Sequence, residues 1–180
     1  MTKQLEIEKK FLIKFPLPFH SMKEVWNHAN KVEEIHQFYL KSAKGVTDRI
    51  RDSIEFGIDS SIYYRTIKTN VSPGINEEEE FILTKKEYDH FCELCDESMF
   101  PIWKTRYTFD YDNQIFELDI FHKRLDNLII LEIELDDINC EVRLPPFLCV
   151  LNDVTMNKKY KNSNLAKLSF SDGKKITNSV

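Results

Sequence analysis

The first segment of the chain alternates between polar and apolar positions. From position 4 to position 11, Glu6, Glu8 and Lys10 occupy every second place, and the places between them are mostly apolar. Because successive side chains of a strand point to opposite faces, this spacing predicts a strand with two carboxylates and one ammonium group on one face. Such a group of side chains can bind a divalent metal and one oxygen of a phosphate.

The same alternation recurs along the chain and predicts eight strands, which are enough to close a barrel. A helical pattern follows the first strand of each half, and each helix is expected to begin with a capping box, Ser21 with Glu24 and Thr84 with Glu87. The order strand, helix and three strands thus occurs twice and suggests two pseudo-repeats. The expected strands lie near 5–13, 36–42, 47–54, 61–69, 77–83, 102–111, 115–122 and 128–135.

Length and composition indicate one domain of the α+β class. The 180 residues are enough for a sizeable core, and no stretch has the composition of a linker. We expect a single domain over residues 1–170, an eight-stranded antiparallel β-barrel built from two β-α-β-β-β halves. Helices are expected to pack outside it, with a closing C-terminal helix over residues 158–170. Residues 171–180 are expected to form a flexible tail.

The charge balance excludes some partners. With 25 Lys and Arg against 30 Asp and Glu, the net charge of -5 argues against non-specific binding to nucleic acid or to an anionic membrane. The N-terminus has no apolar signal core, and no run approaches the roughly 20 apolar residues of a membrane helix. We therefore expect a cytoplasmic protein without nucleic-acid or membrane partners, as a monomer or a homodimer. The four glycines leave no glycine-rich phosphate loop, so a phosphate site would consist of side chains.

The four cysteines are expected to be reduced thiols, because the chain shows no secretion signal. Cys92 and Cys95 form a single CxxC that lacks the second pair of a zinc site. Their helical spacing relative to Tyr88 and Phe91 predicts buried thiols instead.

The charged residues of the expected strands form doublets of like sign at positions i and i+2. Alternating charge in one strand is most often the solvated face of a half-buried sheet. Solvated faces usually mix the signs, however, because like charges on neighbouring strands repel by a few tenths of a kcal/mol to about 1 kcal/mol. Six doublets of like sign need neutralisation, which a metal and a polyanion together would supply. We therefore expect the charged face to line a wide lumen, with helices covering the apolar face from outside.

The expected lumen carries more negative than positive side chains. Its six cations are Lys10, Arg49, Arg51, Lys68, Lys104 and Arg106. Its eight anions are Glu6, Glu8, Glu78, Glu80, Glu117, Asp119, Glu132 and Glu134. Six cations against eight anions leave a charge of -2, which would repel a polyphosphate, whereas two divalent ions would reverse the sign. Metal is therefore expected to be obligatory for substrate binding.

With these motifs the chain resembles the CYTH superfamily, the triphosphate tunnel metalloenzymes. The hallmark of that family is an N-terminal ExExK strand, matched here by Glu6, Glu8 and Lys10. The likeness covers nearly the whole chain and is closest to the short bacterial members that resemble inorganic triphosphatases. The fold of the family, an eight-stranded antiparallel tunnel, agrees with the strand count above. The other matching segments are 37–40, 49–51, 66–68, 78–80, 104–107, 116–119, 132–134, 154–155 and 159–162.

The resemblance implies a role for each charged residue of the lumen. The implied ligands of two magnesium or manganese ions are Glu6, Glu8, Glu132 and Glu134. The implied triphosphate ligands are Lys10, Arg49, Arg51, Lys68, Lys104 and Arg106. The implied catalytic carboxylates are Glu78, Glu80, Glu117 and Asp119. These four would hold the second metal through water, orient the basic side chains or activate the attacking water, and the three roles stay open.

Two positions depart from the family pattern. Asn76 stands where many members have an arginine, two residues before the central ExE strand, so one substrate contact would be weakened or shifted. After the paired prolines, residues 147–153 replace the common Trp-Phe-Gly and acidic residue, and Asp153 is the candidate substitute for the latter. Lys158 and Lys161 more often form a solvated face, but a closing helix could use them as phosphate contacts.

The expected function is metal-dependent hydrolysis of inorganic triphosphate to pyrophosphate and phosphate. The same lumen could serve thiamine triphosphate, a nucleotide or a class IV type adenylate cyclase reaction. Trp103 and Tyr107 lie on the wrong face of their strand to form a platform for a base or thiazole ring. A non-catalytic polyphosphate-binding module is the alternative outside the enzymes, but two carboxylate pairs exceed what phosphate binding needs.

Overall fold

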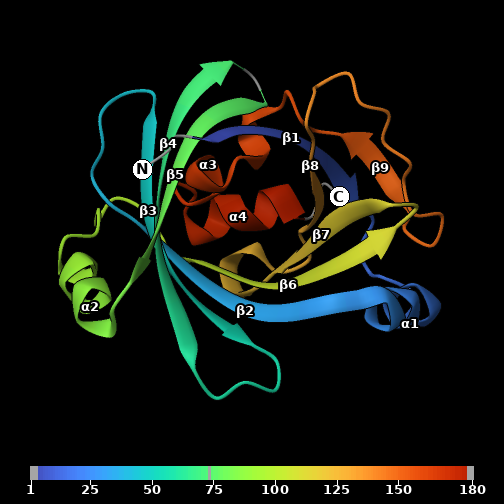
Figure 1. Ribbon diagram of the computed structural model, residues 1–180, viewed down its shortest axis with the longest axis horizontal. Helices are drawn as coiled ribbons and strands as arrows, with labels where there is room; N and C mark the ends of the chain where they lie inside the picture. Colours follow the sequence, from blue (N-terminus) through green and yellow to red (C-terminus); the bar gives the residue numbers. More distant parts are fainter. Residues whose placement is uncertain (1–3, 73, 178–180) are drawn as a thin grey trace.

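Nine antiparallel strands form one sheet that closes into a barrel in the computed structural model, which describes residues 4–72 and 74–177 (Figure 1). The barrel closes because β5 pairs with β4 along one edge and with β1 along the other. The expected eight-stranded antiparallel barrel is confirmed. A short ninth strand, β9, pairs with β1 beyond the β5 contact. The strands are β1 (Gln4–Ile13), β2 (Ala29–Tyr39), β3 (Val46–Glu55), β4 (Ser61–Ser72), β5 (Ile75–Leu83), β6 (Ile102–Tyr111), β7 (Gln114–Phe121), β8 (Ile129–Glu134) and β9 (Val150–Asp153).

The two helices on the outside of the barrel differ in how well their starts could be predicted. The helix α2 (Lys85–Glu93) begins with the expected capping box between Thr84 and Glu87. The helix α1 (Phe19–His28) begins after Pro18, and Ser21 is buried inside it, so the expected cap at Ser21 is wrong. The strand β2 follows α1 directly and starts seven residues before the predicted position 36, because residues 29–35 pair with β6.

The C-terminal segment differs most from its prediction. Residues 158–170 were expected to form one helix, but they form the 3-10 turn η2 (Lys158–Tyr160), the single helical turn α3 (Asn162–Leu165) and an irregular link. The expected tail instead forms the helix α4 (Phe170–Thr177), and residues 178–180 lie outside the described part of the chain. The Ser169 hydroxyl accepts a hydrogen bond from the backbone N–H of Asp172 at the start of α4.

The C-terminal elements pack against one end of the barrel rather than against its outer face. Inward-facing Leu12, Tyr39, Ile102, Phe121 and Ile130 form one buried apolar cluster with residues of η2, α3 and α4, and we call this cluster the floor. Figure 1 shows α3 and α4 within the outline of the barrel. The C-terminal elements therefore close one end of the barrel, as expected of a closing helix, and they do not cover its outer apolar face. The residues that complete the floor are Leu125, Leu128, Val154, Tyr160, Leu165, Ala166 and Ile176.

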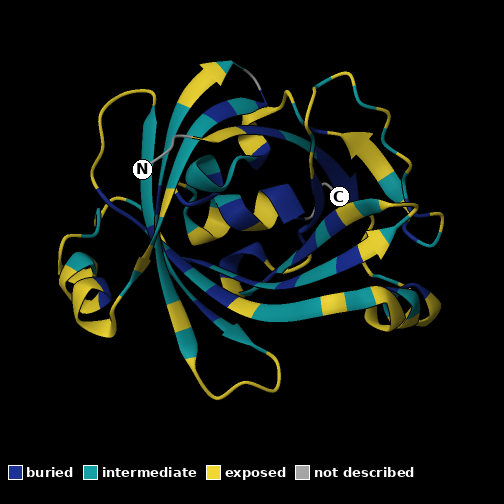
Figure 2. Cartoon of the chain, viewed as in Figure 1, coloured by how far each residue is buried: buried dark blue, intermediate teal, exposed yellow. Residues whose placement is uncertain are grey.

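The outer apolar face is covered in two places. A second cluster, which includes Val25 of α1, lies over β1, β6, β7 and β8, and partly buried residues of the 142–150 segment pack against it. A third cluster joins Tyr88 of α2 to Leu40 and Ile50. Figure 2 shows α2 largely exposed, in agreement with Tyr88 as its one buried residue. Among the described helices, none is long and apolar enough to cross a membrane.

The helix α2 contacts the barrel through Tyr88, its one buried residue, so Cys92 within it and Cys95 just after it are less buried than expected. Cys92 is exposed and Cys95 is half-buried, which makes the prediction of two buried thiols wrong. Burial raises the pKa of Cys95 to about 11, so this thiol stays protonated at neutral pH.

Candidate active site

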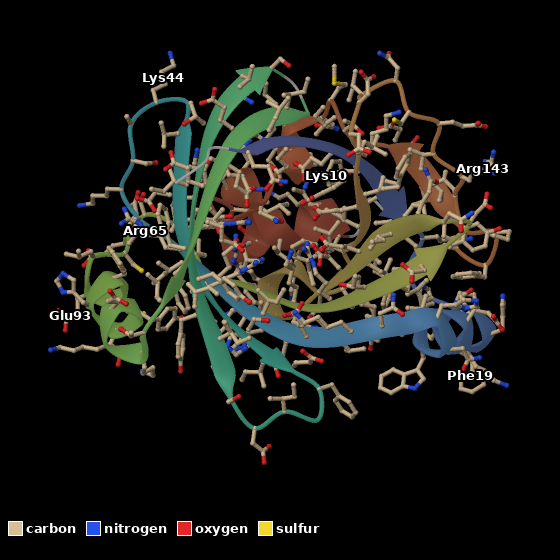
Figure 3. The ribbon with its side chains drawn as sticks, in the orientation of Figure 1. Lys10, Phe19, Lys44, Arg65, Glu93 and Arg143 are labelled. Carbon is tan, nitrogen blue, oxygen red and sulfur yellow. The ribbon has the colours of Figure 1, made fainter. Side chains whose placement is uncertain are left out.

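A cavity of about 400 Å³ lies inside the barrel, within the size range of small-molecule sites. Inward-facing side chains of all eight barrel strands line it, together with Lys161 and the first two residues of α3. Figure 3 shows the side chains that crowd this interior around Lys10. Thirteen of the fourteen predicted site residues line the cavity: Glu6, Glu8, Lys10, Arg49, Arg51, Lys68, Glu78, Glu80, Lys104, Arg106, Glu117, Glu132 and Glu134. The fourteenth, Asp119, is fully buried behind the wall.

Three charged residues of the wall were absent from the predicted lumen. Lys31 and Glu33 line the cavity because β2 begins before its predicted position. Their alternation with the apolar Val32 is the sequence pattern that would have predicted them. Of the two lysines considered above as phosphate contacts, Lys161 lines the cavity and Lys158 does not. Eight cationic and eight anionic side chains therefore line the described wall, so the predicted excess of negative charge is wrong.

A dense group of charges lies beside the floor. Arg106 donates from Nε and Nη2 to the two carboxylate oxygens of Asp119 at 2.6 and 2.7 Å, and from Nη2 to Glu132 at 2.8 Å. Lys104 donates to Asp119 at 2.5 Å. Lys10 contacts Glu132, and its Nζ lies 3.2 Å from Glu8. Asp119 thus fixes the two cations in front of it.

The pKa values in this group follow from burial and ion pairing. Burial alone would lower the pKa of Lys10, but Glu132 and Glu8 outweigh it and raise that pKa. Burial and the neighbouring Arg106 lower the pKa of Lys104 to about 8. Burial would raise the pKa of Glu132, but Lys10 and the two cations on β6 hold it well below its usual range. Lys10 and Glu132 are therefore both charged at neutral pH.

A second group of charges surrounds Lys68. Its ammonium group contacts Glu6 and lies 2.7 Å from Glu78. Asn76, the departure from the family pattern, donates from Nδ2 to the other oxygen of Glu6 at 3.1 Å. The asparagine therefore supplies an uncharged donor to a predicted metal ligand, at a position where an arginine would supply a charge.

Two arginines on β3 have hydrogen-bonding capacity that the described residues do not use. The Nε groups of Arg49 and Arg51 are buried and have no hydrogen-bond partner in that part of the chain. Burial and the neighbouring Arg49 lower the pKa of Arg51, and its Nη2 donates to Glu80 at 3.2 Å while its Nε stays without an acceptor. Buried donors without acceptors are costly. An anion with several oxygen atoms in the cavity would supply the missing acceptors.

The acidic side of the wall fits a divalent metal. Glu8 and Glu134 lie directly opposite each other on β1 and β8. The Glu134 side chain makes no hydrogen bond or ion pair with the described residues, and burial and the nearby Glu6 raise its pKa to about 6. Oxygen donors of this kind are those that magnesium and manganese prefer. The donor set therefore suits the metal, although no three acidic, His or Cys side chains in the described ranges form a ready-made metal cluster.

The aromatic residues are divided between the two faces of the barrel. Trp103 packs against His36 on the outside, with the two rings tilted, and Tyr107 packs in the second cluster, so neither lines the cavity, as predicted. Tyr39 and Tyr64 do line it, although neither was a predicted site residue. The Tyr64 ring lies under the guanidinium group of Arg51, 4.7 Å from ring centre to Cζ.

Comparisons with known proteins agree with this geometry. No family model matches the chain. The chain is 30% identical over 164 residues to an inorganic triphosphatase of Acetivibrio thermocellus, and the match covers 90% of this chain and 93% of that protein. The crystal structure of the inorganic triphosphatase NE1496 superposes with a TM-score of 0.56 at 26% identity, over 94% of this chain and 97% of that one. HpAC1 from Hippeastrum, described as having a dominant triphosphatase activity, shares the fold with a TM-score of 0.52 at 15% identity, over 73% and 80% of the two chains.

Proposed function

This chain belongs to the CYTH superfamily, the triphosphate tunnel metalloenzymes, and on that premise we propose that it hydrolyses inorganic triphosphate to pyrophosphate and phosphate. The name of its relative from Acetivibrio thermocellus, an inorganic triphosphatase, supports this substrate. The site residues that line the cavity support it further, because they combine cations for phosphate oxygens with carboxylates for a metal.

The unused buried donors of Arg49 and Arg51 carry the proposal. A triphosphate has acceptor oxygens on each of its three phosphorus atoms, and guanidinium groups match them with two parallel hydrogen bonds. The two arginines point into the cavity from β3, while the cations of β1, β4 and β6 line its other sides. A linear polyanion would therefore meet donors along its length, which an uncharged or apolar ligand would leave unused.

The proposed cofactors are two ions of magnesium or manganese. The residues that would hold them are Glu6, Glu8, Glu132 and Glu134. When bound, such ions neutralise phosphate charge and lower the pKa of a coordinated water. Among these four carboxylates, Glu134 is the one without an ion pair in the described chain, so a divalent ion would relieve the repulsion that it experiences.

The charged side chains would bind, orient and stabilise the reacting groups. The cations that line the wall would hold the phosphates and stabilise the negative charge that spreads over the transferring phosphoryl group. We assign Asp119 to orienting Lys104 and Arg106, because it is fully buried and contacts both. Glu80 and Glu117 line the cavity and each contacts an arginine, so they would orient that cation or accept the proton of the attacking water.

Substrate preference tests the proposal against the organic triphosphates. We expect kcat/KM for inorganic triphosphate to exceed that for ATP and for thiamine triphosphate at least tenfold. A base or thiazole ring would need an exposed aromatic ring to stack on, and Tyr64 is the one such ring in the described wall. The guanidinium group of Arg51 already covers the Tyr64 ring. Initial rates with each substrate, measured with magnesium and with manganese, give the ratio. A higher value for an organic substrate would assign the site to that substrate, and tight triphosphate binding without turnover would indicate a binding module.

A further inference from the structure

Tyr39 connects the floor to the cavity. Its side chain belongs to the floor cluster and is 3% exposed, yet the residue also lines the cavity. Tyr39 lies directly opposite Arg49 in the pairing of β2 with β3. The ring is thus held by apolar contacts while the hydroxyl group lies among the charged side chains above the floor.

Gln37 fixes the direction of the Tyr39 hydroxyl. Arg49 donates from Nη1 to Oε1 of Gln37 at 3.0 Å, and a guanidinium group can only donate. The amide of Gln37 must therefore present its oxygen to Arg49 and its Nε2 to Tyr39, where it donates to the hydroxyl oxygen at 2.5 Å. Because the phenol oxygen is the acceptor in this bond, its own proton points elsewhere.

The Tyr39 proton has no acceptor among the residues that the structure describes. Burial raises the pKa of Tyr39, so the proton stays on the oxygen at all physiological pH values. The charged groups that act most strongly on the pKa of this hydroxyl are those of Arg49 and Lys10, and neither can accept a hydrogen bond. A buried O–H donor that lies beside cations and lacks an acceptor is suited to an anionic oxygen.

We propose that Tyr39 donates a hydrogen bond to a free terminal phosphate of the substrate at the floor of the cavity, and that Gln37 positions it for this contact. The assignment rests on the proposed function. The floor closes this end with apolar side chains, and Lys161 lines the cavity from the segment that precedes α3. The inner end of the site thus accepts an unesterified phosphate. An organic group at the other end of the triphosphate would have to lie away from the floor.

The substitution Tyr39→Phe tests the contact, because it removes the hydroxyl and keeps the ring in the floor. Calorimetric titration of the full chain with imidotriphosphate, a non-hydrolysable analogue, in the presence of magnesium measures the affinity directly. We expect Tyr39→Phe to raise Kd about 10- to 100-fold, the loss typical of a hydrogen bond to a charged group. Tyr63→Phe is the matched control, since Tyr63 packs in the third cluster beside Tyr88, and it should bind as the wild type does.

A second substitution separates positioning from folding. Gln37→Met removes the amide that orients Tyr39, and the double variant with Tyr39→Phe should lose less affinity than the product of the two single losses. Affinity losses that simply multiply would show that Gln37 does not act through Tyr39. Tyr39→Phe with wild-type affinity would overturn the Tyr39 contact while leaving the proposed function in place. Wild-type protein that does not bind imidotriphosphate would overturn the proposed function, and this assignment with it.

Discussion

Substitution of Arg51 by alanine is expected to lower kcat/KM for inorganic triphosphate about 100- to 1,000-fold, the usual cost of removing one preorganised electrostatic stabiliser. Arg51 lines the cavity, its Nε has no partner in the described chain, and its ion pair is with the exposed Glu80, a kind of pair that contributes little to stability. Removal of this side chain should therefore leave the melting temperature within a few degrees of the wild type. Phosphate release and thermal unfolding of the same preparation measure both quantities.

The neighbouring strand supplies the control for this variant. Arg65 of β4 extends outside the barrel (Figure 3), where it pairs with Asp48 at 2.7 Å and lies over the ring of Phe91. Arg65→Ala removes the same charge from the outer face, and it should keep wild-type kcat/KM with at most about 1 kcal/mol of lost stability. Equal losses of activity in Arg51→Ala and Arg65→Ala would mean that net charge, and not the cavity, determines catalysis.

Asp119→Ala is expected to destabilise the fold by about 3–5 kcal/mol, because it leaves two buried cations without their shared partner. The Asp119 carboxylate is fully buried and accepts hydrogen bonds from Lys104 and Arg106. For a chain of this length such a loss lowers the melting temperature by roughly 6–20 °C. Thermal unfolding at low protein concentration measures it.

Activity and a surface control complete the Asp119 test. The variant should also lose triphosphatase activity at temperatures where it is still folded, because Lys104 and Arg106 are no longer oriented. Asp59→Ala, in the exposed loop between β3 and β4, should change neither quantity. Full activity of folded Asp119→Ala would contradict the role of Asp119 in orienting the two cations.

The inward charged face could be predicted because it follows from period-two alternation alone. Once Glu6, Glu8 and Lys10 are assigned to one face of the first strand, the same rule applied to the other strands finds ten more of the residues that line the cavity. Asp119 follows this rule too, but its depth depends on Lys104 and Arg106, which cover it from another strand. A sequence pattern gives the face of a residue and not its depth.

The parts that could not be predicted depend on contacts between distant segments. The helix α4 forms where a tail was expected because Ile176 packs into the floor, which strand residues far away in sequence create. Gly173 lies so close to the backbone of Arg124 that a side chain there would meet its carbonyl oxygen. The sequence places Tyr39 only within a family motif, because no spacing rule predicts the hydrogen bond that its hydroxyl accepts from Gln37.

The most direct test of the central claim is a phosphorus NMR time course of inorganic triphosphate with chelator-treated wild-type protein, before and after addition of magnesium or manganese. We predict that triphosphate persists without metal and is converted to equal amounts of pyrophosphate and phosphate after metal is added. The variant Glu8→Gln, which alters a proposed metal ligand, should lose this response to metal. The control variant Glu93→Gln, on the exposed end of α2, should retain it. Conversion at the same rate without metal, or the absence of conversion with either metal, would contradict the account.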